Sequence, residues 1–365
     1  MVRRIIVLLF VLAQQIYPIG QSSALTLAWP SGARSLGMGD VGTALADDED
    51  ALFYNPAGLA LPNSRWNSGA SSYYYEPVLP SFKIPDLWHD RWALIYQPEE
   101  SVWGGFGTYF NRINFGISEW ANDLGEVVGR ANSYEYTMGL TWGFNFEEIG
   151  LKNHYFGIST KYVYSALAPG YGPGNEGVGQ TFAFDVGYLW KFFPSMRFGL
   201  TVQNMGPNIF YISQQEQNPI PFTINMALAY SQNFITDNNI IISQVRAEIR
   251  TNREIVKNYI DKQPDPFWTA IYTDLLHDTS KTFKQQLDEF ALHLGAEYTL
   301  FNTLSLRSGF LLDDFDRLYE NHWGFGLKIL NHFQFDYYWL YAPESYLGWL
   351  FHSQGNNGIN HLNWG

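Results

Sequence analysis

The sequence lacks three things: cysteine, basic clusters and long apolar runs. The absence of cysteine excludes disulfides, thiolate metal sites and cysteine nucleophiles, and it is compatible with an exported protein that does not rely on disulfides. The formal net charge is −13, and no cluster of basic residues occurs after Arg4. Both features argue against nucleic acid as a partner, because binding it requires a basic surface that replaces phosphate counterions.

No window of the chain is apolar over the roughly 20 residues that a membrane-spanning helix requires. The N-terminus instead has the parts of an export signal: two arginines, an apolar run from Ile5 to Ala13, and small residues at Ser22 and Ala24. An N-terminal membrane anchor is the alternative, but the apolar run is too short for one. We therefore expect a signal peptide over residues 1–24 and a mature chain that begins at Leu25.

Aromatic residues (18%) and glycines (33) are abundant, which favours strands and turns over helices. Large apolar side chains repeatedly alternate with small or polar ones. From Phe182 to Trp190 every second residue is large and apolar, and a similar pattern occurs from Phe333 to Tyr341. Such alternation predicts strands with one wet face, and about fourteen of them can be placed along the mature chain.

The connections between the expected strands alternate between short and long. Tight turns are expected at 193–195 and 301–303, and long loops at 120–129, 204–221 and 250–289. Short turns on one side and long loops on the other are typical of outer-membrane barrels, in which closure of the sheet leaves no unpaired edge in lipid. The alternative is a soluble exported β-sandwich or propeller, although no blade-length repeat is visible.

These patterns predict an all-β fold, an antiparallel transmembrane β-barrel of about 14 strands that spans residues 63–365. The expected location is the outer membrane of a Gram-negative bacterium, with outer-membrane lipid around the wall. The longest extracellular loop, residues 250–289, has helical spacing in part. It would form a lid or a docking surface, and a merely solvated loop is the alternative.

The wet face of the expected barrel carries charges that would lie in the lumen. If the strands pair in order, opposite charges meet on neighbouring strands, where they are tolerated better than they would be toward lipid. The expected lumen charges are Asp185, Arg197, Glu297, Arg307, Lys328 and Asp336. We favour a structural interpretation, in which these pairs fix the interior and bind nothing, over a binding role.

A compact stretch from Gly32 to Leu61 lies between the leader and the first expected strand. Its glycines allow close backbone approach, and its acidic run at 47–50 suits a helix start or a polar turn. With strands that start on the periplasmic side, this segment must hang in the periplasm or fold into the lumen, and its glycine-rich, largely apolar residues favour the lumen. We predict a plug over residues 25–62, with Gly37, Gly39, Asp40, Asn55, Pro56, Ala57 and Gly58 as its key positions.

Motifs for catalysis and for cofactor or metal binding are absent from the sequence. The histidines show no HExxH spacing, no GxSxG elbow occurs, and Gly37-Met38-Gly39 is not part of a nucleotide-binding fingerprint. The acidic run at 47–50 lacks the alternating oxygen ligands of a calcium loop. We expect neither an enzyme nor a bound cofactor, and no catalytic or metal-binding residues.

Three segments resemble known families of outer-membrane barrels. The first, from Gly32 to Ala60, reads GARSLGMGDVGTALADDEDALFYNPAGLA. Its Asn55-Pro56-Ala57 motif is similar to that of the FadL-like superfamily, in which an N-terminal segment folds into the lumen as a hatch. Together with the segments from Phe198 to Tyr230 and from Gly295 to Asp314, it resembles the PorV/PorQ family more closely. That family is associated with type IX secretion.

The resemblance implies an outer-membrane barrel of about fourteen strands. Of the two functions that follow, we expect the first, and the second is the alternative. In the first, the protein is an accessory of protein secretion: its outer loops bind a type IX translocon or the C-terminal signal domains of cargo, and the plug stays shut. In the second, it is a FadL-like transporter, in which a hydrophobic small molecule enters from outside. The molecule then leaves by plug movement or through a side opening in the wall.

Overall fold

The computed structural model describes residues 22–62, 69–78, 86–98, 104–122, 124–147, 150–170, 177–238, 240–259, 262–278, 280–313, 315, 318–329 and 333–341, and the backbone of 362–364. The signal peptide expected over residues 1–24 lies outside the described residues, apart from its last three positions.

Antiparallel strands make up most of the described structure. They form where aromatic and β-branched residues alternate with small or polar ones, the composition that suits a pleated sheet with two different faces. The strands are β1 (Gly69–Pro77), β2 (Trp88–Tyr96), β3 (Gly105–Ala121), β4 (Val127–Phe146), β5 (Leu151–Ala166), β6 (Val178–Phe193), β7 (Met196–Met205), β8 (Ile209–Phe210), β9 (Gln217–Asn218), β10 (Thr223–Ile235), β11 (Ile241–Glu254), β12 (Ala291–Leu300), β13 (Leu304–Asp313), β14 (Leu318–Ile329), β15 (Phe333–Tyr341) and β16 (Leu362–Trp364).

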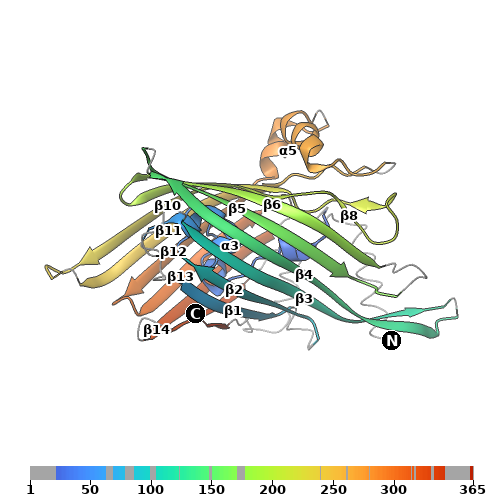
Figure 1. Cartoon of the computed structure of the whole chain (residues 1–365), viewed down its shortest axis with the longest axis horizontal. Helices are drawn as coiled ribbons and strands as arrows, with labels where there is room; N and C mark the ends of the chain where they lie inside the picture. Colours follow the sequence, from blue (N-terminus) through green and yellow to red (C-terminus); the bar gives the residue numbers. More distant parts are fainter. Residues whose placement is uncertain are drawn as a thin grey trace.

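All of these strands except β8 and β9, which form a separate ribbon, belong to one closed barrel. Neighbouring strands follow the chain order, from β1 to β7 and then from β10 to β16 (Figure 1). The ring closes at β16, where Trp364 lies opposite Tyr73 of β1 and Phe335 of β15. The prediction of an all-β, antiparallel sheet of about fourteen strands is therefore confirmed.

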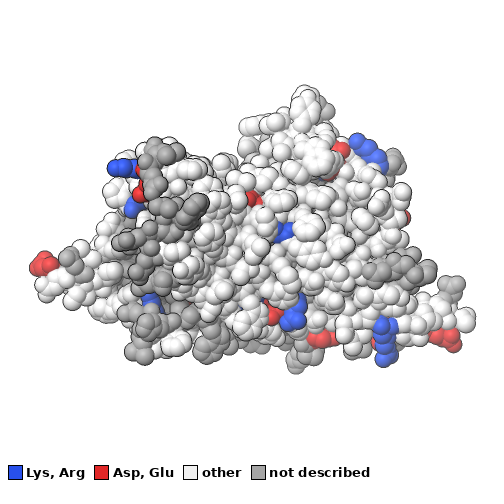
Figure 2. All heavy atoms as spheres, in the orientation of Figure 1, with Lys and Arg blue, Asp and Glu red and all other residues white. Residues whose placement is uncertain are grey.

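The two faces of the wall differ sharply in chemistry. On β6, Phe182 and Phe184 point outward and are 58% and 50% exposed, whereas Ala183 and Asp185 between them point inward and are buried. The same alternation recurs on the other long strands, for example at exposed Leu228 of β10. We call the outward apolar residues of the strands the outer belt. Figure 2 shows that charged side chains are sparse over the middle of one side of the molecule.

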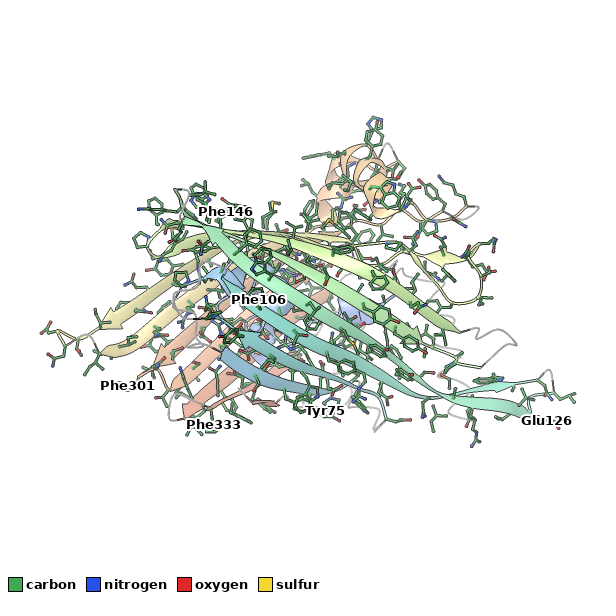
Figure 3. All side chains as sticks on the ribbon, in the orientation of Figure 1. Tyr75, Phe106, Glu126, Phe146, Phe301 and Phe333 are labelled. Carbon is green, nitrogen blue, oxygen red and sulfur yellow. The ribbon has the colours of Figure 1, made fainter. Side chains whose placement is uncertain are left out.

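The two ends of the barrel also differ. Phe146, Phe301 and Phe333 lie at the end where short turns join the strands, and Glu126 lies at the opposite end (Figure 3). The prediction of a long loop around 120–129 is wrong. The backbone hydrogen bonds between β3 and β4 continue beyond the neighbouring strands, as far as Ala121 and Val127. A tight turn at 122–126 then joins them.

Residues 22–62, which we call the inner segment, hold four short helices: η1 (Leu25–Leu27), α2 (Ala33–Gly37), α3 (Ala51–Tyr54) and η2 (Pro56–Ala60). These helices contact the strands from the inner side of the wall: α2 lies against β13, β14 and β15, and η2 lies against β3 to β6. Most residues of the inner segment are buried. Its ribbon is visible between the strands in Figure 1.

A second non-strand region connects β11 to β12. It contains α4 (Phe267–Ala270), the π-helical turn η5 (Ile271–Leu276) and α5 (Phe283–Asp288). In Figure 1 this region stands beside the wall rather than across the barrel end. Within the described ranges, no helix is both long and apolar enough to cross a membrane.

Candidate functional site

The candidate site is the contact between the inner segment and the inner face of the wall. Gly37 of α2 meets Gly324 of β14 so closely that a Cβ added at Gly37 would lie 3.2 Å from the Gly324 Cα. Gly39 has a φ of +76°, and a Cβ there would lie 2.7 Å from the backbone nitrogen of Phe310. Gly39 therefore needs glycine for both close approach and backbone conformation, whereas a side chain at Gly37 would require Gly324 to shift by a few tenths of an ångström.

Asn55 joins the inner segment to itself and to the wall. Its side-chain NH₂ donates to the carbonyl oxygens of Thr43 (2.7 Å) and Tyr188 (3.2 Å), and its Oδ1 accepts from the Ala57 backbone N–H (3.1 Å). Asn55 thus acts as the N-cap of η2, with Pro56 at the first helical position, where a missing N–H costs nothing. The Asn-Pro-Ala motif fixes this turn, and Asn55 is fully buried.

The wall makes room for this turn with glycines. A Cβ at Gly157 of β5 would lie 2.2 Å from the carbonyl carbon of Pro56, and one at Gly187 of β6 would lie 2.1 Å from Asn55 Oδ1. Gly58 is equally confined, because a Cβ there would lie 2.2 Å from the Ala46 carbonyl oxygen. A larger residue at Gly157 or Gly187 would push the inner segment away from the wall, and one at Gly58 would push apart two stretches of the inner segment.

A buried ion network lies where α2 meets β12 to β15. Arg307 binds Glu297 (2.8 Å) and Asp336 (2.6 Å), so three of the predicted lumen charges lie together. Glu297 also accepts from Arg34 of the inner segment (3.1 Å), which in turn binds Asp48 (2.6 Å). The network therefore joins the inner segment to the wall through charges that compensate one another, as buried charges must.

The other predicted lumen charges lie elsewhere. Asp185 binds Lys161 (2.7 Å), and both are buried. Arg197 lies beside a different carboxylate of the inner segment, Asp47, at 3.7 Å. Lys328 occupies an inward position of β14 near the short-turn end, and its backbone N–H donates to the Thr303 carbonyl.

Asp40 is held by two side chains at a turn with a φ of +63°. Arg250 of β11 pairs with its carboxylate at 3.1 Å, and the Tyr54 hydroxyl donates to the same group. Burial, together with this neighbouring carboxylate, raises the pKa of Tyr54 well above its ordinary value, so the phenol stays protonated.

Several wall residues that hold the inner segment were not predicted. The carboxylate of Glu248 accepts four backbone N–H groups, from Gly42 (2.9 Å), Thr43 (2.8 Å), Ala44 (3.1 Å) and Leu45 (2.6 Å). A carboxylate suits such a turn, because it satisfies donors that have no other partner there. The signal for it was the alternation of Arg246, Glu248 and Arg250 on one face of β11.

Two further unpredicted wall residues fix the beginning of the inner segment. Arg91 of β2 donates to the Ser31 carbonyl (2.6 Å) and pairs with Asp50 (2.7 Å). Glu135 of β4 accepts from both the backbone N–H (2.7 Å) and the hydroxyl (2.8 Å) of Thr26. The inner segment is therefore tied to β2, β4, β11, β12 and, through Arg307, β13.

Glu49, in the acidic run of the inner segment, has a pKa far from its ordinary value. Burial raises its pKa to about 8, and the neighbouring carboxylates of Asp48 and Asp50 act in the same direction. Glu49 is consequently protonated at neutral pH. This neutral state lets an acidic run sit inside the barrel without a corresponding excess of negative charge.

Two cavities adjoin the wall. One, of about 470 Å³, opens beside the short turn at 194–195 and is lined by polar groups that include Lys191, Arg197, Arg246 and Asp47. The other, of about 750 Å³, is an apolar groove on the outer face of β1 to β6, walled by aromatic side chains that include Trp92. Within the described part of the chain, no three acidic or histidine side chains are grouped to hold a metal ion.

No protein-family model matches the sequence, and no curated protein matches it either. Solved structures match the fold. The toluene transporter TodX of Pseudomonas putida superimposes with a TM-score of 0.50 and 11% sequence identity, over 91% of this chain and 95% of TodX. A TodX deltaS2S3 mutant, a monoaromatic hydrocarbon channel, gives a TM-score of 0.52 at 10% identity, over 91% of this chain and 96% of the mutant.

A FadL homologue from Pseudomonas aeruginosa covers 92% of this chain and 95% of its own at 10% identity, with a TM-score of 0.44. By their names these structures are a transporter, a channel and a FadL homologue, and none is an enzyme. At this level of identity the likeness to TodX defines the fold alone. The chain therefore has the fold of the TodX barrel.

Proposed function

We propose that this protein is an outer-membrane channel for hydrophobic small molecules. In this proposal residues 63–365 form the transmembrane barrel, residues 25–62 form its plug, and residues 1–24 are the cleaved leader. The observation that carries the proposal is a wall that is apolar outside and polar inside, closed around the chain's own N-terminal segment, in the fold of a toluene transporter. An apolar exterior on a closed barrel suits lipid, because every backbone group is paired within the sheet.

The plug residues have distinct roles in this proposal. Gly37 and Gly39 let the chain lie directly on β14 and β13, while Asp40 is held by Arg250. Asn55, Pro56, Ala57 and Gly58 form the turn that rests on β5 and β6. The lumen charges Asp185, Arg197, Glu297, Arg307, Lys328 and Asp336 are structural, and no catalytic residue, metal or cofactor is part of the proposal.

The apolar groove on the outer face supports a hydrophobic ligand rather than a polar one. Its lining includes the aromatic residues Trp92, Phe110, Tyr162 and Phe182 and smaller residues such as Thr108. In the proposed location this groove faces acyl chains. A hydrophobic compound that leaves through a side opening in the wall could therefore enter it without leaving an apolar surrounding, whereas a polar solute would lose its hydration there. A polar solute gains nothing from such walls.

The second candidate function is that of a PorV/PorQ-type accessory of type IX protein secretion, with a translocon or cargo C-terminal signal domains as partners. The segments from Gly32 to Ala60 and from Phe198 to Tyr230 favour it, because they resemble that family. The many contacts that tie the plug to the wall suit a barrel that stays shut. The fold of TodX favours the transport function over this one.

Deletion of the gene in its native host separates the two functions. Transport predicts slower uptake of a radiolabelled monoaromatic hydrocarbon, with the set of secreted proteins unchanged. Lost secretion with unchanged uptake would contradict transport and support the accessory role. Mass spectrometry of the purified protein gives an independent answer, because a bound hydrophobic compound supports transport and a co-purifying translocon or cargo supports secretion.

A reversible disulfide between the plug and the wall tests whether the plug moves during transport. The chain has no cysteine, so the double variant Thr26→Cys with Thr137→Cys would carry one pair, at positions whose side-chain hydroxyl oxygens lie 2.8 Å apart between the plug and β4. We expect the oxidised protein to lose uptake and the reduced protein to recover it, with each single variant as a control. Uptake that persists in the oxidised protein would exclude plug movement and leave a side opening as the route.

A further inference from the structure

The region from Ile255 to Phe290, which we call the helical insertion, packs on the outside of the barrel. Its buried residues Ile255 and Ala270 form a cluster with Phe222, against which Val202 and Ile224 also pack. Val202 and Ile224 are outward positions, because their neighbours Thr201 and Asn225 point inward and are buried. The loop predicted to be a lid or a docking surface therefore covers part of the outer belt.

The opposite side of the helical insertion is apolar and uncovered. Trp268, Tyr272 and Leu276 are 61%, 58% and 68% exposed and follow one another at intervals of four residues. Phe283 and Leu287, also four residues apart, are 76% and 52% exposed. Residues at this spacing share one face of a helix, so two adjoining helical elements each present a row of large apolar side chains.

Six charged side chains of the helical insertion and the adjoining end of β11 lie beneath this apolar side and compensate one another, while Lys262 and Lys284 are exposed. Arg253 binds Asp274 (3.2 Å) and Glu289 (2.5 Å), and Lys281 binds the same two carboxylates. Lys257 binds Asp278 (2.6 Å). The three cations match the three carboxylates, and the carboxylates are almost fully buried. Buried charged side chains beneath exposed apolar ones are the reverse of the arrangement expected for a surface in contact with water.

The uncovered apolar side is continuous with the outer belt. Along the outward face of β10, the helical insertion covers Ile224, whereas the following outward residues Met226, Leu228 and Tyr230 are 40%, 45% and 41% exposed. Lipid that covers the outer belt would therefore also contact the helical insertion. Trp268 and Tyr272 are the residue types that concentrate where membrane and water meet.

We propose that the helical insertion lies in the outer leaflet of the membrane, with its uncovered apolar side buried in lipid. This inference rests on the proposed location of the barrel in a membrane. The helical insertion acts as an in-plane amphipathic element that widens the barrel's footprint on one side, at the level where acyl chains meet headgroups. Its occupant is lipid, not water and not a protein partner.

Single-cysteine labelling tests the proposal directly, since the chain supplies no background thiol. Three matched variants, Leu276→Cys, Leu228→Cys and Leu124→Cys, place an environment-sensitive fluorophore on the helical insertion, on the outer belt, and at the tip of β3–β4, where Leu124 is 84% exposed. The full-length protein is inserted into phosphatidylcholine vesicles. Some vesicles carry nitroxide-labelled lipids, with the label near the headgroup or deep in the chain.

We expect the fluorophore at position 276 to be quenched by the shallow nitroxide and shielded from aqueous iodide several-fold better than the one at position 124. The fluorophore at position 228 should be quenched by nitroxide lipid as well. Iodide access at 276 equal to that at 124, with lipid quenching at 228, would overturn the inference and leave the barrel in the membrane. Loss of quenching at 228 too would overturn the proposed membrane location itself.

A second preparation shows whether lipid or a protein partner covers the helical insertion. If the fluorophore at position 276 is open to iodide in the pure vesicles but shielded in native outer membranes, a protein covers the helical insertion and the lipid proposal fails. Equal shielding in both preparations supports lipid.

Discussion

The inner segment and the helical insertion lie on opposite faces of one wall and neutralise their buried charges in different ways. Both carry clusters of buried charge. The inner segment pairs its charges with the wall, for example Arg34 with Glu297 and Asp50 with Arg91. The helical insertion pairs Lys257 and Lys281 with its own carboxylates and takes Arg253 from a strand.

The difference follows from what each face of the wall offers. Inward positions supply arginines, carboxylates and glycines, so a segment there can be small, tightly fitted and polar. Outward positions supply mainly apolar side chains, so a segment there must neutralise most of its own charges, with the help of outward Arg253, and attach through residues such as Phe222 and Ile224. The position of a non-strand region relative to the wall thus dictates how its charges are compensated.

The largest expected effect comes from breaking the ion network of the inner segment. In Glu297→Gln, three arginines lose a shared buried carboxylate, which should lower the free energy of unfolding by about 3–5 kcal/mol. Urea unfolding of the barrel in detergent, followed by gel mobility, measures it. The control Glu119→Gln removes an exposed pair with Arg130 and should cost less than about 1 kcal/mol. Equal losses would contradict the network's role.

The protonation of Glu49 predicts a pH dependence. Its pKa in the folded protein, about 8, lies above the ordinary 4.5, so between these values the folded state holds a proton that the unfolded state has lost. Stability should therefore fall by up to about 1.4 kcal/mol per pH unit as pH rises through that window. Glu49→Gln should flatten this slope and be the more stable form at pH 8. Glu126→Gln, at the exposed turn, should leave the slope unchanged.

A smaller effect is expected from Gly157→Ala. The new methyl group would lie 2.2 Å from Pro56, so the inner segment must shift, at a cost of about 1–3 kcal/mol. Limited proteolysis should cut residues 22–62 faster in this variant and leave the helical insertion unaffected. Val186→Ala, on the outward face of the neighbouring strand, is the control, and equal cutting in both would refute the close fit.

The smallest effect is expected in the helical insertion. Lys281→Met leaves Asp274 and Glu289 with Arg253 as their shared cation, which should loosen the helical insertion by about 1–2 kcal/mol. Hydrogen exchange should rise in residues 267–288 while exchange in the strands and the inner segment stays the same. A global loss of protection would mean that the helical insertion and the barrel unfold as one unit.

The fold could be predicted because strand alternation is local. The pattern from Phe182 to Trp190 identified which side chains point inward, and the turn at 193–195 followed from the sequence. The grouping of Glu297, Arg307 and Asp336 also followed, because neighbouring strands pair in order.

The contacts of the inner segment could not be predicted, because they depend on how a separate piece of chain is placed inside the closed sheet. Nothing near Arg34 in the sequence points to Glu297, 263 positions away. In the same way, the spacing of Phe283 and Leu287 predicted a helix but not the face of the wall on which it packs. The β3–β4 extension was missed because polar and apolar residues mix around Trp120, which made the segment resemble a loop.

The closure of the barrel at β16 has a consequence for how the molecule assembles. Tyr73 pairs with Trp364, so the contact that completes the ring joins residues from opposite ends of the described chain. Pairings of such long sequence separation form late and slowly, since much chain must be ordered before they gain anything. The inner segment must already be enclosed when this seam forms. The rate-limiting step of folding is therefore expected to be the pairing of β1 with β16 around the inner segment, and a helper that brings these two strands together would accelerate assembly more than one that stabilises the finished barrel.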